Sequence, residues 1–149
     1  HEEEMARRFK MGQVLLNQRQ FAQAREHFEF CMERDRYNGL YRAHYGWAIY
    51  SDPKERENDG AERAYEVIRE ASLLDQNEPI IQVYFGQLLR ERGELSHAAT
   101  VLRRVLRSDP TNSAARRELN AIKAEDPSIR IDGGDPESTA KSKKGLFGR

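Results

Sequence analysis

Apolar residues recur along the chain with the three- and four-residue spacing of helices that are buried on one side. Phe9, Leu15 and Leu16 form one such face, and a second face runs from residue 21 to residue 31. The polar stretch 17–20 between them predicts a tight turn and therefore an antiparallel helix pair. No segment alternates apolar and polar residues as a half-buried strand does, so the pattern predicts an all-α protein.

The same spacing predicts two further helix pairs and a final single helix. Pro79 suits the start of a helix, where its missing N–H loses no hydrogen bond. The segment 108–110 ends a helix, and Asn112 or Ser113 caps the next one. After the first pair, the predicted ranges are 40–51, 60–74, 79–91, 95–107 and about 113–124. We therefore expect about seven helices.

Glycine, alanine and large apolar residues return at fixed offsets, which indicates that the helix pairs are copies of one unit. Gly12 and Gly46 are 34 residues apart, and Gly46 and Gly86 are 40 apart. The glycine and the next matching alanine are 12 residues apart in the first and third units, but 18 apart in the second, where the alanine is Ala64. The six extra residues fall in the stretch SDPKERENDG, which predicts a lengthened loop.

This repeat resembles the tetratricopeptide repeat (TPR) family, whose 34-residue unit carries W-x2-L-G-x2-Y, A-x3-F and a closing proline. The third unit keeps Gly86, Leu89, Ala98, Leu102 and Pro110 at the family's places. The family's tryptophan is replaced in all three units and its proline in the first two, by Arg8, Arg42, Gln82, Arg36 and Gln76. The resemblance implies a right-handed superhelical array of antiparallel helix pairs, a TPR-like α-solenoid.

The resemblance also divides the chain. We expect a repeat domain over 1–124, with units at about 5–38, 39–78 and 79–112 and a capping helix at 113–124, followed by a flexible basic tail over 125–149. One helix pair cannot bury its apolar side alone, so stacked units share a core. The residues expected in that core are Met11, Leu15, Phe28, Tyr45, Ile49, Ile68, Phe85, Leu89, Leu102 and Leu106.

In this family the first helices of successive units line a concave surface that binds partners. The resemblance places on that surface Phe9, Gln13, Leu16, Asn17, Ala43, Trp47, Tyr50, Val83, Gln87, Arg90 and Arg117. Trp47 is the only tryptophan. Trp47 and Tyr50 would offer an apolar or extended peptide a large contact area at low entropic cost. The alternative is that both pack against the long loop.

Chaperone-binding members of the family hold a peptide's terminal carboxylate with a Lys and an Asn one turn apart on the first helix. The corresponding places here hold Phe9 and Gln13, and in the second unit Ala43 and Trp47. The resemblance therefore does not extend to this carboxylate clamp or to an acidic C-terminal tail as the ligand.

The composition offers little for other chemistry. Lys+Arg and Asp+Glu balance at 25 each, which gives no support for binding nucleic acid through bulk charge. Cys31 is the single cysteine and is expected to be packed, and His44 is expected to be packed or on the surface rather than a general base. No phosphate-binding glycine loop or metal-ligand spacing occurs in the sequence. We predict no enzyme activity, no cofactor and no metal.

Two further stretches carry open alternatives. The charged strip 52–63 is interpreted as a solvated loop, with a partner contact as the alternative. The last nine residues are basic around Leu146 and Phe147, and are either a solubilising end or a motif that weakly contacts a partner or an anionic membrane. No apolar run is long enough to span a bilayer. The start, HEEEMARRF, lacks a natural initiator, so we expect a longer protein. It also lacks a signal-peptide pattern, which together with the lone cysteine favours a cytoplasmic location.

The sequence thus predicts a non-catalytic scaffold that binds a peptide or protein segment in its concave groove. One alternative is the C-terminal adaptor or targeting part of a larger regulatory or co-chaperone protein. Another is a self-assembly module, in which exposed faces or the tail form homo-oligomers.

Overall fold

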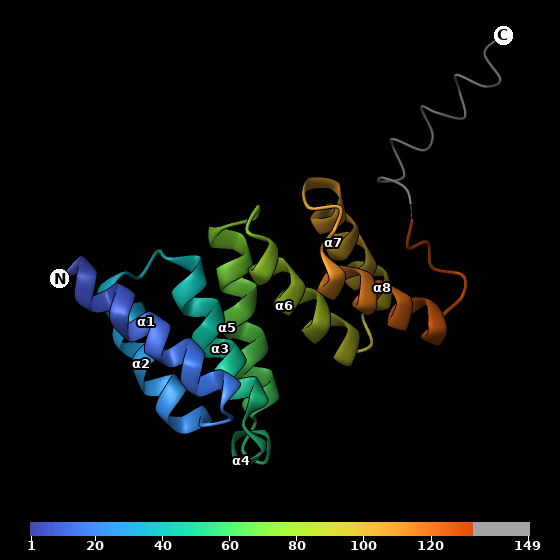
Figure 1. Ribbon diagram of the computed structural model, residues 1–149. Helices are drawn as coiled ribbons and strands as arrows, with labels where there is room; N and C mark the ends of the chain where they lie inside the picture. The colour runs from blue at the N-terminus through green and yellow to red at the C-terminus, as the bar shows by residue number, and fades with distance from the viewer. Residues whose placement is uncertain (133–149) are drawn as a thin grey trace, which may run out of the picture. The chain divides into compact units, whose positions relative to one another are not determined.

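The computed structural model describes residues 1–132, which form helices joined by short turns (Figure 1). The helices of the three pairs are α1 (Glu2–Asn17) and α2 (Phe21–Arg34), α3 (Gly39–Ser51) and α5 (Gly60–Leu74), and α6 (Pro79–Glu91) and α7 (Leu95–Ser108), followed by α8 (Ser113–Glu125). These residues contain no strand, and each range predicted after the first pair agrees with the structure within one residue. The all-α prediction is confirmed.

The insertion of the second repeat (39–78) contains one more helix than the sequence predicts. The single turn α4 (Pro53–Arg56) lies at the ends of α3 and α5 (Figure 1). The side chain of Asp52 accepts a hydrogen bond from the N–H of Lys54 at 3.0 Å, and Pro53 takes the first helical position. The stretch interpreted as a solvated loop is therefore partly helical.

Two of the inter-helix turns are built in the same way. Asn38 caps α3 by accepting from the N–H of Tyr41 at 3.1 Å, and Asn112 caps α8 by accepting from the N–H of Ala115 at 2.9 Å. Each asparagine also donates to the aspartate three residues before it. The repeat thus extends to its turn chemistry, and Asn112 is the predicted cap of the last helix.

The chain divides into two compact units, residues 1–84 and the residues from 85 on, with the boundary inside α6. In the first unit, Ala24, Phe28 and Ala48 form one buried cluster. Ala43 and Ala71 form a second with Ile81. In the second unit, the core includes Leu89, Leu102, Leu119 and Ile122, all at most 2% exposed.

The repeated glycine allows the two helices of a pair to approach closely. A Cβ atom on Gly12 would lie 2.6 Å from the ring of Phe28, and one on Gly46 would lie 2.8 Å from Ile68. In the second unit a Cβ on Gly86 would lie 2.6 Å from Leu102. Real Cβ atoms do not come this close to buried side chains, so the recurring glycine has a packing role.

Most residues expected in the core are covered, but Met11 is not. Met11 is 45% exposed. The helices α2 and α3 pack on the sides of α1 that carry Gly12 and Leu15. The corresponding residue of the third repeat, Phe85, is buried. The repeat register alone therefore does not decide whether this position is buried.

Polar side chains occupy the three places where the TPR pattern has tryptophan, and each joins two helices. Arg8 on α1 donates to Nδ1 of His27 on α2 at 2.8 Å. Arg42 on α3 pairs with Glu70 on α5 at 3.0 Å. Gln82 on α6 donates to the main-chain carbonyls of α5 and the turn after it. Hydrogen bonds thus replace the aromatic packing that the family pattern has at these places.

The first residues of the predicted tail contact the second unit. Residues 126–132 follow α8, and Arg103 on α7 donates to the carbonyl of Arg130. The basic stretch around Leu146 and Phe147 lies outside the described residues. None of the helices in the described part of the chain is long and apolar enough to cross a membrane.

Candidate functional site

A cavity of about 580 Å³ opens on the first unit where α1, α3 and α4 end near one another. Its walls come from the last turn of α1, the α1–α2 turn, the last turn of α3, the α4 turn and α6. The residues lining it are Leu16, Asn17, Arg19, Phe21, Trp47, Tyr50, Ser51, Pro53, Arg56 and Tyr84.

Three aromatic rings form a row along this cavity. Trp47 and Tyr84 stack face to face, with centroids 4.4 Å apart and planes 5° apart. Tyr50 lies one helical turn from Trp47, with centroids 5.2 Å apart. On its other side, Tyr84 contacts the buried ring of His44 edge-on at 5.7 Å. The aromatic row therefore connects the cavity to the core.

The two polar groups at the inner end of this row are uncharged at neutral pH. Burial raises the pKa of Tyr84 to about 12, so its hydroxyl keeps its proton. Burial also lowers the pKa of His44, whose Nδ1 lies 2.8 Å from the carbonyl of Leu40. His44 is thus a packed histidine, as expected, and the floor of the cavity is neutral and largely aromatic.

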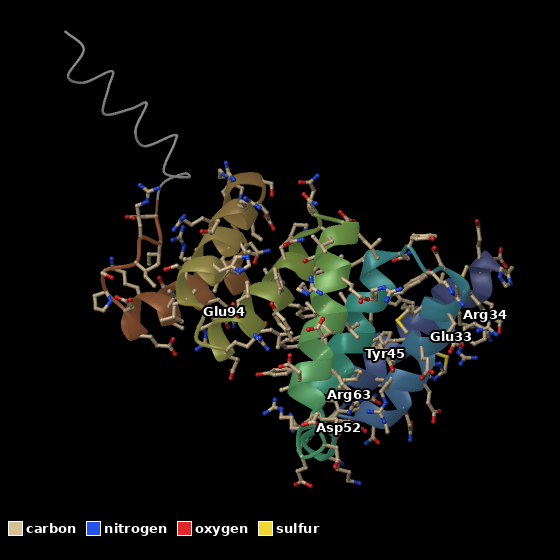
Figure 2. The ribbon with its side chains drawn as sticks, turned by 180° about the vertical axis from the view of Figure 1, so that it is seen from behind. Glu33, Arg34, Tyr45, Asp52, Arg63 and Glu94 are labelled. Carbon is tan, nitrogen blue, oxygen red and sulfur yellow. The ribbon has the colours of Figure 1, made fainter. Side chains whose placement is uncertain are left out.

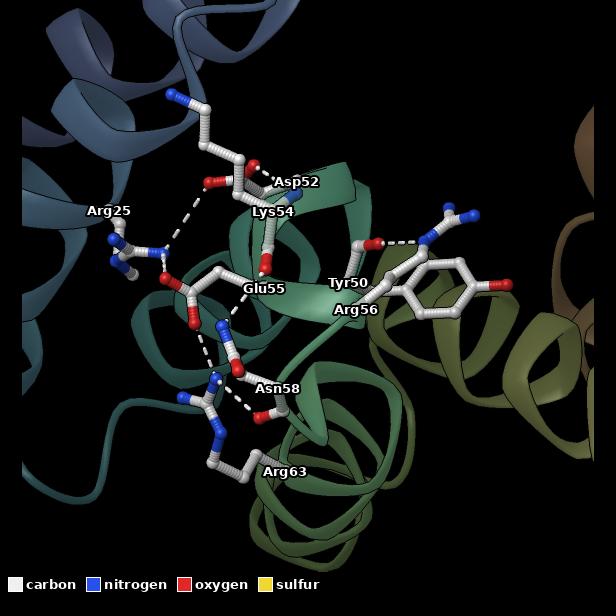
Figure 3. A network of polar contacts seen from close by, with 8 residues as sticks. All are labelled: Arg25, Tyr50, Asp52, Lys54, Glu55, Arg56, Asn58 and Arg63. Carbon is white, nitrogen blue, oxygen red and sulfur yellow. Dashed lines mark hydrogen bonds and ion pairs between the residues drawn. The ribbon is translucent and has the colours of Figure 1, made fainter.

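Two arginines stand at the outer wall. Nε of Arg56 donates to the carbonyl of Tyr50 at 2.7 Å, and its guanidinium lies 4.5 Å from the centre of the Tyr50 ring (Figure 3). Arg19 lies 5.2 Å from the centre of the Phe21 ring. The backbone of Arg19 is left-handed, with φ of 62°, because the chain reverses there between α1 and α2. Contacts within their own turns therefore determine the positions of both guanidinium groups.

Ion pairs hold α4 against its neighbours. Arg25 on α2 pairs with Glu55 at 3.0 Å and with Asp52 at 3.7 Å, and Arg63 on α5 also bonds to Glu55 (Figure 3). Asp52 and Arg63 lie beside the α4 turn at the same end of the unit (Figure 2). The hydrogen bond from Arg63 and the charge of Arg25 lower the pKa of Glu55. This network fixes the turn that carries Arg56.

Four of the residues predicted for the groove line this cavity: Leu16, Asn17, Trp47 and Tyr50. Two others cannot contact a partner, because Ala43 is fully buried and Val83 is only 5% exposed. Their helix faces pack inward, which corrects the prediction at both positions.

Phe9 and Gln13 also lie away from the cavity lining. The ring of Phe9 contacts those of Tyr41 and His44 at 5.1 and 4.8 Å, and it packs on the first buried cluster. Gln13 is half-buried on the same helix. Phe9 therefore contributes to helix packing rather than to the cavity.

The remaining predicted groove residues belong to the second unit. Arg90 binds Glu118 at 2.7 Å and Glu125 at 3.3 Å, and the hydrogen bond to Glu118 raises its pKa. These ion pairs connect α6 to α8. Gln87 is half-buried, and Arg117 is exposed. Their groove assignment stays a prediction.

Sequence reasoning missed Tyr84 and the cations of the wall. Tyr84 lies three residues before Gln87, so a wider arc of the same helix face would have included it. Arg19 and Arg56 come from turns, where helical periodicity has no meaning. The signal in the sequence that includes Arg56 is the charged strip 52–63 of the insertion.

The other reactive residue types are packed or dispersed. Cys31 is fully buried, its Sγ lies 3.3 Å from the carbonyl of Met5, and burial raises its pKa. The packing prediction for Cys31 is confirmed. Within residues 1–132, no three His, Cys, Asp or Glu side chains are grouped so as to hold a metal ion.

Solved structures of TPR domains are similar to this chain. The first TPR of Spaghetti (RPAP3), bound to the HSP90 peptide SRMEEVD, is 19% identical with a TM-score of 0.72, and the match covers 85% of this chain and 98% of that one. The first TPR domain of human RPAP3 is 18% identical, with a TM-score of 0.70 and coverage of 83% and 93%. The chain therefore has the TPR fold.

A bacterial structure is also similar. The Yersinia enterocolitica type III secretion chaperone SycD, in complex with a peptide of the translocator YopD, is 15% identical, with a TM-score of 0.63 and coverage of 83% and 95%. No protein-family model and no curated protein matches the sequence.

Proposed function

We propose that this TPR-fold chain is a non-catalytic interaction module that binds a peptide or an extended protein segment at the cavity around Trp47. The observation that carries the proposal is the row of Trp47, Tyr50 and Tyr84 along an open cavity on the first unit. Two of the similar structures contain bound peptides, which supports this class of ligand.

The cavity has the features of a site for an apolar anchor. Aromatic side chains lose little conformational entropy when a ligand binds, and they offer large contact areas. Trp47 is held by Tyr84 on one face, so its ring is already oriented before a ligand arrives. Asn17, Ser51 and the protonated hydroxyl of Tyr84 supply hydrogen-bonding groups for a peptide backbone.

The ligand of the HSP90-peptide complex does not transfer to this chain. The places of the carboxylate clamp hold Phe9, which packs among rings, and Ala43, which is fully buried. Neither side chain can bind a carboxylate. We therefore propose recognition of an internal or extended segment through its side chains rather than through a C-terminal carboxylate.

The test begins with selection of peptides from a random dodecapeptide library displayed on phage, using the chain as bait. The most enriched peptide is then synthesised with a fluorescent label, and its affinity is measured by anisotropy. We expect Trp47→Ala to weaken binding about tenfold or more, because the central ring of the row is lost. Circular dichroism should show unchanged helix content.

The matched control is Tyr37→Ala. Tyr37 is an aromatic residue of the same unit, is 84% exposed and lines a different cavity with Leu73 and Leu74. We expect this variant to bind the peptide within about twofold of the unmodified chain. Failure to enrich any peptide, or equal affinity of the Trp47→Ala variant, would refute the proposed function.

A further inference from the structure

We infer that the segment bound at this cavity is acidic beside its apolar anchor, and that the α1–α2 turn and α4 provide the cations that recognise it. This inference rests on the proposed function and adds the chemistry of the partner. It assigns a binding role to the insertion that contains α4, which the TPR pattern does not contain.

The aromatic cavity continues into a second one. The second cavity, of about 420 Å³, is lined by Arg19, Gln20, Phe21, Ala22, Gln23, Asp52, Pro53 and Lys54. Arg19, Phe21 and Pro53 line both cavities. The α1–α2 turn and α4 therefore border one continuous surface, long enough for a ligand that occupies the aromatic cavity and extends beyond it.

This surface is cationic. The residues lining the two cavities include Arg19, Lys54 and Arg56, whereas Asp52 is their single acidic member. The carboxylate of Asp52 is already engaged, since it caps α4 and pairs with Arg25. A ligand there meets guanidinium and ammonium groups without a competing free carboxylate in the lining.

The guanidinium of Arg56 is oriented before binding. Its Nε is bonded to the carbonyl of Tyr50, which turns the two terminal nitrogens outward from that bond. Its backbone belongs to the turn that Glu55 ties to Arg25 and Arg63. A planar guanidinium that is already fixed can bind a carboxylate bidentately with less loss of entropy.

A peptide fits these features better than a nucleic acid does. The charges of the whole sequence balance at 25 and 25, so the positive potential is local to this surface. Nucleic-acid binding usually depends on a broad basic face that contacts many phosphates. Three cations beside an aromatic floor suit a few acidic side chains that flank one apolar anchor.

The enriched dodecapeptides test this directly. We expect an excess of Asp and Glu next to the apolar residues, compared with the unselected library. The most enriched peptide, resynthesised with Asn and Gln in place of Asp and Glu, should bind the unmodified chain about tenfold more weakly. In the variant Arg19→Asn/Arg56→Gln, the preference for the acidic peptide over its amide version should fall to about threefold or less, because only Lys54 remains. Asn is chosen at position 19 because it tolerates left-handed backbone.

The control variant is Arg7→Gln/Lys10→Gln, which makes the same change of net charge on exposed residues of α1 outside both cavities. It should keep the full preference for the acidic peptide. The inference is overturned if the enriched peptides carry no excess of acidic residues, or if Arg19→Asn/Arg56→Gln keeps the preference. It is also overturned if a dodecathymidine oligonucleotide binds as tightly as the peptide and loses affinity in that variant.

These outcomes separate the two proposals. Peptides that depend on Trp47 but show no acidic preference would leave the proposed function standing and remove only the cationic extension. Peptides that bind the Trp47→Ala variant as tightly as the unmodified chain would refute the proposed function, whatever their charge.

Discussion

At the scale of single residues, Trp47 gains its orientation from neighbours distant in sequence. Tyr84 lies 37 positions further along the chain and covers one face of the indole. Tyr84 in turn rests on His44, which contacts Phe9 and Phe28. A change in this buried cluster is therefore expected to reach the cavity through aromatic contacts.

The buried histidine predicts a pH dependence of stability. The groups whose rings contact His44 are Phe9, Phe28 and Tyr84, none of which is charged at neutral pH. Burial lowers the pKa of His44 below its ordinary 6.5, so the unfolded chain takes up the proton first. The contribution of the neutral His44 to the free energy of unfolding is therefore fully present above about pH 6.5. It falls as the pH drops from there to the pKa of His44 in the folded state.

Urea denaturation from pH 7 to pH 5 measures this effect. One such group contributes a slope of at most about 1.4 kcal/mol per pH unit. His44→Gln should make the slope smaller. A remainder is expected from His27, whose pKa burial and the charge of Arg8 also lower. An unchanged slope in His44→Gln would contradict the assigned effect of burial at this position.

At the scale of elements, the close contact of α3 and α5 depends on Gly46. An added Cβ would lie 2.8 Å from Ile68, which is fully buried and cannot move aside. Alanine favours the helix by about 1 kcal/mol over glycine, whereas overpacking costs roughly 1–3 kcal/mol. We expect Gly46→Ala to lower the free energy of unfolding by about 1 kcal/mol, measured in urea.

Gly93 provides the control for this prediction. Its φ is +83°, and an added Cβ would have no atom within 4 Å. Gly93→Asn should leave stability nearly unchanged, since asparagine tolerates left-handed backbone. A Gly46→Ala variant as stable as Gly93→Asn would show that the helices can separate without cost.

The insertion yields a prediction that separates binding from stability. Glu55→Gln weakens the ion pairs from α4 to α2 and α5, and such partly exposed pairs contribute about 1 kcal/mol or less to stability. The affinity for the enriched acidic peptide should fall by several-fold, about threefold to tenfold, because α4 positions Arg56. Calorimetric titration of the peptide measures it.

Glu57→Gln makes the same change of charge in the same insertion. Glu57 is exposed at the end of α4 and forms none of the ion pairs that hold this turn. Its variant should bind like the unmodified chain. Equal affinity of the Glu55→Gln variant would show that the network does not position the binding cations.

The elements themselves could be predicted from the sequence because their signals are local. Gly12, Gly46 and Gly86 set the register, and Pro79 and Asn112 mark helix starts, so the helix ranges agree with the structure. The α4 turn was missed because four residues are too few to show periodicity.

The candidate site was only partly predictable. Trp47 and Tyr50 follow from the helix face, but Tyr84 joins them through contacts distant in sequence. Ala43 and Val83 were wrongly expected to be exposed, because the covering of a helix face depends on its neighbours. The contribution of side chains from turns, such as Arg56, could be recognised only from the structure.

At the scale of the whole molecule, Trp47 reports on the first unit alone, whereas circular dichroism reports on all helices. The boundary between the units lies inside α6, so unfolding of either unit removes part of a helix that the other uses. We expect the urea transitions from Trp47 fluorescence and from circular dichroism to coincide. Two separate midpoints would show that the units unfold independently.

The central claim, that the cavity around Trp47 is where a partner binds, is tested most directly by mapping a bound peptide on the whole chain. The measurement is a titration of the ¹⁵N-labelled chain with the enriched dodecapeptide, followed by two-dimensional NMR. The largest shift changes should fall on the indole N–H of Trp47 and on the amides of Leu16, Tyr50 and Tyr84. Changes centred instead on Tyr37, Leu73 and Leu74, with the Trp47 signal unmoved, would contradict the account.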